Sequence, residues 1–411
     1  MRIPTMLALA VLVLVRASDA LTLQDFIQCI GPQGQGPVCQ LDAGSYSINA
    51  TLFIGRSNIT IQGGVPASPS STTVQRAAGF TDSLLRDTTA PLAPLHSITI
   101  RNLTFDGNRT QNTGPYSSYS PEATVFTATS VLISNCSFIE SPNTGLGLYG
   151  AGTSGVVVNN STFSHDLIFG LWAGPTGNFG GATYLDCAGV TFPSNVVVAN
   201  SQFDRSGENA ILGDFIGLQL IGNTFTNTYT YAVVAGVNWG GAGGQIDLTP
   251  CTQNAAVVRN TFQGGSAPPD PGLSPGTTQG IEVHASDVSI VNNTVSYNWF
   301  DGLSLGGAAD IFVANWDSTT GFLNNTGGGI SITQGTGSDS IRPVDFITID
   351  TTVVSNNLRW GLWSMTSGAP INHVTVTNSC LQNNAYGPES LSGLGSDVTI
   401  ANNLTTGCGP K

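Results

Sequence analysis

One short phrase recurs along most of this chain: two or three alternating apolar residues, then Asn, then a small polar residue and often Phe. The clearest copies run from Ile98 to Phe105, Val131 to Phe138, Val156 to Phe163, Val196 to Phe203, Leu218 to Phe225 and Ala255 to Phe262. The shortest intervals between the starts of neighbouring copies are 22 to 24 residues. A repeat of that length is typical of stacked architectures, in which each unit packs only on its neighbours.

A second recurring segment lies between the phrases and begins with Gly or Ala, followed by two apolar residues one position apart. Its copies start at Gly145, Gly170, Ala210, Ala232, Gly280, Gly302, Gly329 and Gly361. Apolar residues at every second position predict strands, and no helical period separates the two segments. The unit therefore contains two strands, which favours a β-solenoid. A leucine-rich repeat has a similar period, but the alternation of Val, Ile, Thr and Phe disfavours it.

The recurring Asn is explained by the same architecture. Asn tolerates the left-handed backbone angles of a tight turn, and stacked Asn amides form hydrogen bonds from one coil to the next. In these features the chain resembles the right-handed parallel β-helix proteins of the pectin-lyase-like superfamily, over roughly residues 45 to 405. The resemblance implies an all-β fold: a right-handed, single-stranded parallel β-helix of about 10 to 12 coils with a short N-terminal capping helix.

The N-terminus has the features of a signal peptide. Arg2 precedes an apolar run from Met6 to Val15, and Ser18 and Ala20 are the small residues that signal peptidase reads. We therefore predict residues 1–20 as the signal. Further apolar stretches are too short to cross a bilayer, so we expect no membrane insertion and a location that is secreted or in the lumen of the secretory pathway.

Residues 21–411 are predicted to form a single β-helix domain. Its first part, 21–45, is expected to be a cap in which Thr22 begins a short helix that covers the open edge of the first coil. Three stretches exceed the repeat length and are predicted insertions: 106–123, 173–195 and 236–279. Long loops on a rigid solenoid commonly form the walls of a binding groove.

Cysteines and glycosylation signals agree with export. We predict the disulfides Cys29–Cys39, Cys187–Cys251 and Cys380–Cys408, which leave Cys136 as a free thiol packed inside a repeat phrase. Asn-x-Ser/Thr sequons predict N-glycans in a eukaryotic secretory pathway. They stand at Asn49, Asn58, Asn102, Asn108, Asn135, Asn159, Asn160, Asn292, Asn324 and Asn403.

Charge restricts the class of partner. Only 9% of the residues are charged, the formal net charge is -13, and the only Lys is Lys411. Binding a polyanion requires basic groups that replace its counterions, so nucleic acid and strongly anionic polysaccharides are poor partners. The expected substrate is a small molecule or a glycan with little charge.

No strong catalytic motif is present, so candidate residues follow from the predicted register. Residues at the second and fourth positions after the Gly or Ala of the second segment should point outward on one face. Glu282 and His284 then lie side by side, Asp214 lies two coils below them, and Asp301 lies about one coil above. These acids fall within the roughly 5 to 10 Å that two-carboxylate glycosidases use, and His284 is a further proton-transfer group. We therefore predict these four residues as catalytic.

Aromatic and polar residues near this face are predicted to bind the substrate. They are Trp172, Trp239, Trp299, Trp360, Trp363, Arg359, Glu208 and Tyr231. Indoles grouped on one face form a stacking surface for sugar rings or for flat apolar metabolites. His165 and Asp166 form a second candidate pair. No cofactor is implied, and the outward rows supply too few converging carboxylates for a calcium site.

Three functional hypotheses fit these residues. The first is a secreted carbohydrate-active enzyme, a glycoside hydrolase or lyase, that acts on a neutral or weakly charged glycan by carboxylate and histidine acid–base chemistry. The second is a lyase, isomerase or cyclase of an apolar secondary metabolite, for example a pericyclase, which the scarcity of charge favours. The third is a non-catalytic cell-wall or adhesion protein, for which Glu282→Gln and Asp214→Asn would leave the biological activity intact.

Overall fold

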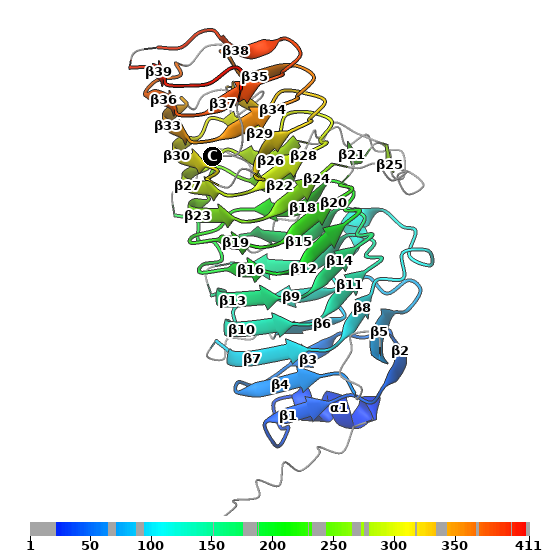
Figure 1. Ribbon diagram of the computed structural model, residues 1–411. Coiled ribbons are helices and arrows are strands. Elements are labelled where there is room, and N and C mark those ends of the chain that lie inside the picture. Colours follow the sequence, from blue (N-terminus) through cyan, green and yellow to red (C-terminus); the bar gives the residue numbers. More distant parts are fainter. Residues whose placement is uncertain are drawn as a thin grey trace, which may run out of the picture.

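Three long parallel sheets wind around one apolar core in the computed structural model (Figure 1). The structure describes residues 22–64, 71–87, 94–150, 152–175, 187, 189–228, 230–231, 244–264, 273–274, 279–316, 319–333, 343–366, 370–395 and 397–407. In most coils the chain contributes one strand to each sheet and then begins the next coil. The all-β parallel β-helix predicted from the repeats is confirmed.

The strands are grouped by sheet. The first sheet has 13 strands: β1 (Val38–Gln40), β4 (Ile59–Gln62), β7 (His96–Arg101), β10 (Thr129–Ser134), β13 (Ser154–Asn159), β16 (Val197–Ala199), β19 (Gln219–Ile221), β23 (Gln253–Val258), β27 (Ser286–Val291), β30 (Ala309–Ala314), β33 (Asp345–Asp350), β36 (Val374–Thr377) and β39 (Thr399–Ala401). The second has 12: β2 (Gly44–Ile48), β5 (Thr72–Arg76), β8 (Thr104–Asp106), β11 (Ser137–Ile139), β14 (Thr162–Ser164), β17 (Gln202–Asp204), β20 (Thr224–Thr226), β24 (Thr261–Gln263), β28 (Thr294–Ser296), β31 (Gly321–Leu323), β34 (Val353–Ser355) and β37 (Cys380–Gln382). The third also has 12: β3 (Leu52–Ile54), β6 (Leu85–Asp87), β9 (Ala123–Val125), β12 (Thr144–Tyr149), β15 (Phe169–Gly174), β18 (Asn209–Gly213), β22 (Gly244–Leu248), β26 (Gln279–Val283), β29 (Leu303–Gly306), β32 (Ile330–Thr333), β35 (Trp360–Met365) and β38 (Gly387–Leu391). Outside these sheets, β21 (Thr230–Tyr231) pairs antiparallel with β25 (Leu273–Ser274).

Each repeat phrase supplies two strands, so a coil has three strands rather than the two expected from the sequence. In one coil, β7 ends at Arg101 and β8 begins at Thr104. Between them Asn102 takes a left-handed φ of 59°. Asn135, Asn160 and Asn200 take left-handed angles in the next coils, as the sequence predicts for this position. One left-handed residue turns the chain sharply enough to split the phrase between the first and second sheets.

Columns of like residues hold successive coils together. The Phe of the phrase forms a stack with ring centroids 4.5–5.2 Å apart, made of Phe105, Phe138, Phe163, Phe203, Phe225 and Phe262. Two buried Asn ladders run from coil to coil, Asn223–Asn260–Asn293 and Asn298–Asn325–Asn357–Asn384, and in each the side-chain nitrogen donates to the next Oδ1. The predicted Asn hydrogen bonds are therefore present, and the stack is a rigid support for its outer faces.

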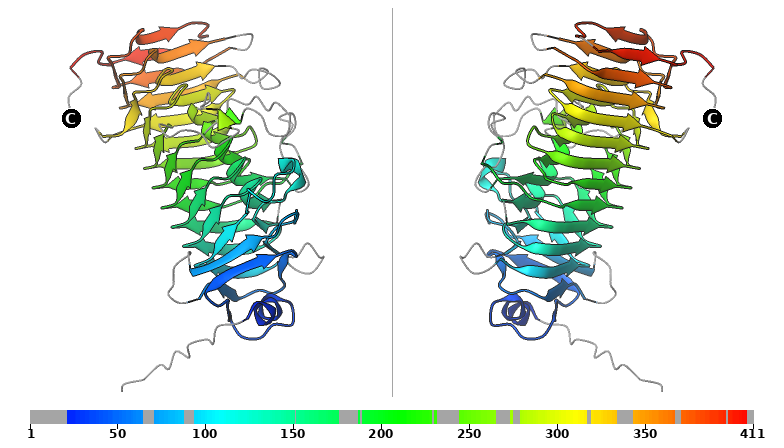
Figure 2. Two further views of the ribbon diagram at one scale, coloured as in Figure 1. Left: turned by 90° about the vertical axis from the view of Figure 1, so that its right-hand side faces the viewer. Right: turned by 90° about the vertical axis from the view of Figure 1, so that its left-hand side faces the viewer.

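A short helix closes the N-terminal end of the stack, as predicted. Helix α1 (Leu23–Ile30) begins at Thr22, whose hydroxyl oxygen accepts a hydrogen bond from the backbone N–H of Asp25. Its buried residues Phe26 and Ile30 join the core below the first coil. Figure 2 shows this helix beneath the lowest strands. Within the described residues, no helix has the length and apolar character needed to span a membrane.

Two of the three predicted disulfides are confirmed. Cys29 pairs with Cys39 and Cys187 pairs with Cys251, while Cys136 is a free, buried thiol. Cys380 is disulfide-bonded. Its predicted partner Cys408 lies outside the described residues, so that pairing stays a prediction.

A buried ion pair lies between the second and third sheets. Arg76, at the end of β5, donates to the Glu122 carboxylate at 3.0 Å, and both side chains are fully buried. Ser141 also donates to Glu122, at 2.9 Å. Burial raises the pKa of Glu122 to about 7 against the opposing effects of Arg76 and Ser141. The neighbouring Asp166 is also buried, and its pKa is raised.

We expect Glu122 to make folding stability fall as pH rises. A carboxyl whose pKa is raised in the folded state stabilises the fold fully below its unfolded value of 4.5, and this contribution is lost as pH rises through about 7. Where the folded state binds one proton more than the unfolded state, the free energy of unfolding falls by up to about 1.4 kcal/mol per pH unit. Urea unfolding at pH 5, 6, 7 and 8 measures the slope. Glu122→Gln should flatten it over this range, and an unchanged slope would show that other groups control it.

Candidate functional site

Outward-facing residues of the third sheet form one continuous row. In register from strand to strand it contains Gly147, Trp172, Leu212, Asp247, Glu282, Ser304, Ser331 and Trp363. Counting two positions on from the Gly or Ala of each second segment predicts the same row with one error: the copy that starts at Ala232 gives Val234, where the sheet has Asp247. The register pairs Leu212 with Asp247 and Asp247 with Glu282, and Val234 lies outside the described residues.

Asp247 is the functional candidate that the sequence reasoning missed. Strand β22 reads Gly-Gln-Ile-Asp-Leu, with the same alternation of buried apolar residues as its neighbours. The segment beginning at Ala232 has the same pattern, so the sequence offers two candidates for one coil. Strand pairing selects β22, and a search for acids inside every apolar-x-apolar segment would have found Asp247.

Glu282 and His284 lie side by side at the end of β26, as the sequence predicts. They are two residues apart in an extended chain, and His284 Nε2 lies 3.1 Å from Glu282 Oε1. The other ring nitrogen, Nδ1, lies 2.6 Å from the carbonyl oxygen of Gly306. A carbonyl can only accept, so Nδ1 carries a hydrogen and the ring is held with Nε2 toward Glu282.

Charge keeps the His284 ring protonated. Burial lowers the pKa of His284, but the hydrogen bond and charge of Glu282, the charge of Asp247 and the carbonyl of Gly306 together raise it to about 10. At neutral pH the imidazolium therefore donates from Nε2 to Glu282. This contact fixes the Glu282 carboxylate in one position.

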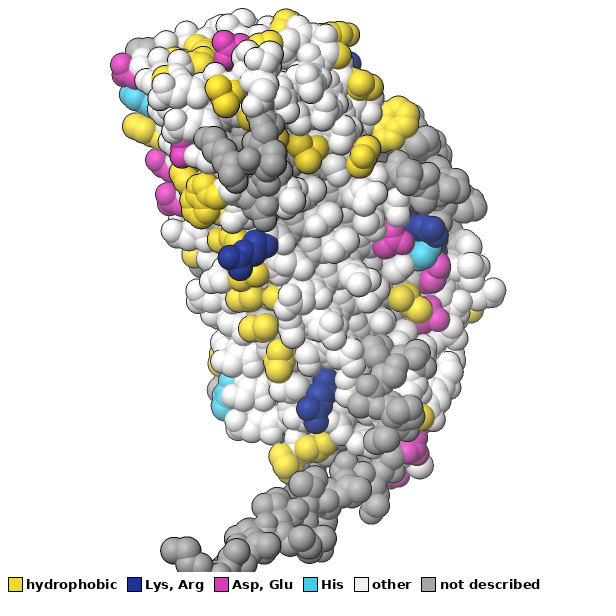
Figure 3. Space-filling view, in the orientation of Figure 1, with side chains coloured by type: hydrophobic (Ala, Val, Ile, Leu, Met, Phe, Trp, Pro, Cys, Tyr) yellow, Lys and Arg dark blue, Asp and Glu magenta, His cyan; other side chains and the backbone are white. Residues whose placement is uncertain are grey.

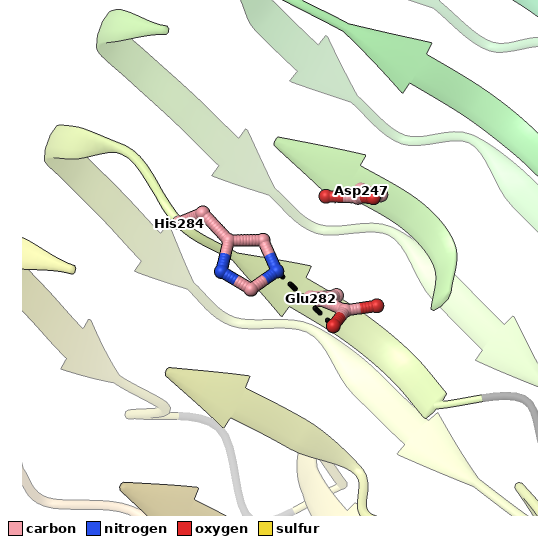
Figure 4. A group of neighbouring side chains, drawn as sticks. All are labelled: Asp247, Glu282 and His284. Atoms are coloured by element: carbon pink, nitrogen blue, oxygen red, sulfur yellow. Dashed lines mark hydrogen bonds and ion pairs between the residues drawn. The ribbon is translucent and has the colours of Figure 1, made fainter. Parts of the chain in front are cut away.

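Asp247 faces this pair from the neighbouring strand (Figure 4). Its side chain is 7% exposed, and Oδ1 has no hydrogen-bond partner among the described residues. Burial raises the pKa of Asp247 well above its usual value, and the charges of Glu282, Asp214 and Glu208 add to this effect, while His284 opposes it. One donor atom from each of Asp247, Glu282 and His284 lies within 4.8 Å of the others. We call these residues the acid–histidine cluster.

The acid–histidine cluster combines two carboxyls in different surroundings. Burial and neighbouring carboxylates raise the pKa of Asp247, whereas Glu282 accepts a hydrogen bond from a cationic ring. A carboxyl with a raised pKa beside one that accepts from a cation can supply a proton donor and a nucleophile or base in one site. One imidazole nitrogen and two carboxylates are also a donor set for a transition-metal dication, so these are the residues that could hold one.

Asp214 lies two coils below His284 but outside the acid–histidine cluster. Its Oδ1 accepts hydrogen bonds from the Thr249 hydroxyl and, at 3.0 Å, from the backbone N–H of Cys251. These contacts hold the turn that follows β22. Glu208 lies before β18, and burial raises its pKa to about 7. Both acids affect the cluster by raising the pKa of Asp247.

Asp301 lies one coil above Glu282 but interacts with the coils beyond it. Its carboxylate accepts a hydrogen bond from the backbone N–H of Gly328. Burial raises the pKa of Asp301, and the hydrogen bond from Gly328, the nearby polar groups of Ser331 and Trp363, and the charge of Arg359 oppose this shift. Asp301 therefore belongs to a separate polar group near Trp363.

The tryptophans predicted as a stacking surface differ in exposure. Trp172 is 5% exposed and packs against Tyr149, Leu167, Ile168 and Phe169, so its indole is covered rather than available as a platform. Trp299 is 49% exposed, whereas Trp360 and Trp363 are half-buried. Trp360 contacts Tyr386 edge to face, with ring centroids 6.0 Å apart. The accessible indoles are therefore those on the C-terminal side of the cluster.

The remaining predicted residues do not join the acid–histidine cluster in the described part of the chain. Trp239 lies outside that part, and Tyr231 is described only as backbone in β21. Arg359 is exposed. His165 and Asp166 are not a pair: Nε2 of the His165 ring accepts from Arg205 at 2.8 Å, while the buried Asp166 accepts from the backbone N–H of Ser141.

We expect Asp247→Asn to stabilise the fold. Asp247 is ionised in the unfolded chain at pH 7, so folding must either bury its charge beside other carboxylates or take up a proton, and the neutral amide avoids both costs. The thermal midpoint should therefore rise at pH 7. Asp214→Asn is the control, because Asp214 already has hydrogen-bond donors and gains nothing from the change. A lower midpoint for Asp247→Asn would show that Asp247 stabilises the structure.

Solved structures with a similar fold come from carbohydrate-active enzymes. The chain is similar to the A-module of the mannuronan C-5 epimerase AlgE6 of Azotobacter vinelandii, with 13% identity, a TM-score of 0.59 and coverage of 90% of this chain and 91% of that chain. It is also similar to a variant of the periplasmic alginate epimerase AlgG, with 11% identity, a TM-score of 0.61 and coverage of 93% of this chain and 88% of that chain. A third similar structure is the catalytic unit of a GH87 alpha-1,3-glucanase of Streptomyces thermodiastaticus strain HF3-3. The identity is 15% and the TM-score 0.51, with coverage of 93% of this chain and 65% of that chain. At these identities the likeness concerns the fold.

Sequence comparison places the chain in a fold family. No curated protein matches it. The family described as "Right handed beta helix region" matches residues 93–316, which is more than half of the 411 residues. The match agrees with the resemblance drawn from the repeats, including the right-handed sense in which the chain winds. This protein therefore belongs to the right-handed β-helix family.

Proposed function

We propose that the protein is an exported carbohydrate-active enzyme, a retaining glycoside hydrolase that works at the acid–histidine cluster. The observation that carries this proposal is the spacing of two carboxyls on adjacent strands, with oxygens within 4.8 Å of each other. Retaining glycosidases hold their two carboxyl groups about 5 to 5.5 Å apart, whereas inverting enzymes need about 6.5 to 9.5 Å for an intervening water. The spacing favours the retaining chemistry.

The two carboxyls have distinct roles in the proposed reaction. Glu282 attacks the anomeric carbon as its bond to the leaving oxygen breaks, and Asp247 gives that oxygen its proton. A water then attacks the anomeric carbon and releases Glu282, while Asp247 takes back a proton from the water. His284 is a positioning residue, since its Nε2 hydrogen bond orients the Glu282 carboxylate.

A neutral or weakly charged glycan is the proposed substrate. The chain has a formal net charge of -13, and the face in Figure 3 carries only scattered Lys and Arg side chains. Mannuronan and alginate, the polymers named in the titles of the two epimerase neighbours, are polyanions and would be repelled by this balance. An α-1,3-glucan, the substrate class of the third neighbour, carries no charge. Trp299, Trp360 and Trp363 are the proposed sugar contacts.

Export is proposed from the signal-like N-terminus and from the disulfides. Cys29–Cys39 and Cys187–Cys251 agree with an oxidising compartment, because such bonds rarely persist in a reducing cytosol.

A second candidate reaction is epimerisation or β-elimination on a sugar ring. The carboxylate and imidazole of Glu282 and His284 are groups that transfer protons, and two of the fold neighbours are titled epimerases. This reaction abstracts a proton from carbon, so it would incorporate solvent deuterium into the product or leave a carbon–carbon double bond.

One panel experiment separates these candidates. The purified protein is incubated with neutral α- and β-glucans, mannans, xylans and alginate, and the products are analysed for reducing ends, for ultraviolet-absorbing unsaturated ends and by proton NMR in deuterium oxide. New reducing ends with retained anomeric configuration support the proposal. Inverted configuration, an unsaturated product or deuterium on carbon would replace it with another reaction. A panel without any product would favour a small-metabolite substrate or a non-catalytic role.

A further inference from the structure

An exposed indole lies on the side of the coil opposite to the proposed chemistry. Trp316 is 62% exposed and is the most exposed indole among the described residues. It follows β30, on the turn from the first to the second sheet, whereas the acid–histidine cluster lies on the third sheet. Indoles at surfaces are costly to hydrate and are commonly covered by a flat partner.

Asn292 lies one coil below Trp316 and is held by it. The residue has a left-handed φ of 53°, and its Oδ1 accepts a hydrogen bond of 2.9 Å from the backbone N–H of Trp316. Because the side-chain oxygen points toward the Trp316 backbone, Nδ2, which lies in the same amide plane on the other side of Cγ, points away from that backbone. That nitrogen donates no hydrogen bond within the described part of the chain. Asn292 also begins the sequon Asn292-Asn293-Thr294.

Several other sequons use the corresponding nitrogen inside the fold. Asn135 Nδ2 donates to Asn102 at 2.7 Å and Asn108 Nδ2 donates to the carbonyl of Arg76 at 3.1 Å. The nitrogen of Asn403 donates to the carbonyl of Val376 at 3.0 Å. A sugar on any of these atoms would crowd a contact that the coil uses. Asn292 differs from these three because its oxygen accepts the hydrogen bond and its nitrogen donates none to a described residue.

We propose that Asn292 carries an N-linked glycan whose first N-acetylglucosamine covers the indole of Trp316. The reaction needs a lipid-pyrophosphate-linked oligosaccharide as co-reactant in the secretory pathway. A bond forms between Asn292 Nδ2 and the anomeric carbon of the sugar, the bond from that carbon to the pyrophosphate oxygen breaks, and the nitrogen loses one proton. The lipid pyrophosphate leaves. The attached ring then shields the indole from water and leaves the outer face of the third sheet open.

The modification is tested on the full chain secreted from a eukaryotic host. Glycopeptide mass spectrometry should find Asn292 occupied in most molecules. Trimming with an endoglycosidase that leaves one N-acetylglucosamine should keep the thermal midpoint, and complete removal with an amidase should lower it by about 1 to 3 °C. Trp316→Ala should lower the midpoint of the glycosylated protein and should have a smaller effect after complete removal, because the two changes remove the same contact.

Two variants make the result decisive. The amidase converts each glycosylated Asn to Asp, so Asn292→Asp, which lacks the sugar and carries that same residue, should lower the midpoint as far as complete removal does. Asn49→Gln, at an exposed sequon, should leave the midpoint unchanged. An unmodified Asn292 peptide would overturn the proposal. Equal effects of Trp316→Ala with and without the sugar would also overturn it, because they would show that the indole and the glycan do not interact. Neither outcome depends on the proposed glycosidase activity.

Discussion

Glu282→Gln should lower kcat roughly 1,000-fold on the glycan identified by the panel, because the amide can neither attack the anomeric carbon nor carry the negative charge that His284 stabilises. The amide has nearly the same shape, so the fold should be unchanged by circular dichroism. His284→Gln should lower kcat less, by about 10- to 100-fold, because it removes the positioning contact and leaves the carboxylate in place. Steady-state kinetics measure both effects.

Chemical rescue distinguishes a nucleophile from a residue that only supports the site. In Glu282→Ala the small cavity admits azide, which can attack the anomeric carbon in place of the carboxylate, so added azide should restore turnover and produce a glycosyl azide. Glu140→Gln is the matched control, since Glu140 is a half-buried carboxylate paired with Arg109 on the second-sheet side. Activity of Glu282→Gln above about one tenth of the wild-type value would refute the catalytic role.

Asn325→Ala should destabilise the protein by about 4 kcal/mol, because it removes four buried hydrogen bonds at once. Asn325 is fully buried, and its oxygen accepts from the backbone and side-chain nitrogens of Asn298. Its nitrogen donates to the carbonyl of Val295 and to Asn357. Alanine leaves these groups without partners in a core that water does not reach. Urea unfolding and the thermal midpoint measure the loss.

Position in the stack provides the control for this prediction. Asn403 lies in the last coil and is half-exposed, and its side chain makes two comparable contacts, with Ser379 and Val376. Water can replace those contacts in Asn403→Ala, so we expect a loss of about 1 kcal/mol. Equal losses for Asn325→Ala and Asn403→Ala would mean that the buried ladder adds no more stability than surface hydrogen bonds.

Much of the scaffold follows from the sequence because its rules are local. Alternation at period two marks a strand, and an Asn that repeats at one position marks the bend, so the coil, its core Phe and its amide ladders could be predicted. The same alternation places Glu282 and His284 on one outer face, since residues two apart in a strand point to the same side. The N-terminal cap follows equally from Thr22 and its hydrogen bond to the first turn of α1.

Pairing between coils is not a local property, and it decided the rest of the site. Two segments of this chain fit the strand that precedes β26, and only hydrogen bonding across the sheet places Asp247, rather than Val234, beside Glu282. Burial likewise depends on what covers a residue: Trp172 points outward but is covered, and the Asp214 carboxylate holds the turn after β22. The sequence by itself determined the repeating coil and the face that carries Glu282 and His284. The tertiary structure decided which third group joins them and how deeply that group is buried, because register and burial arise from contacts between residues far apart in the chain.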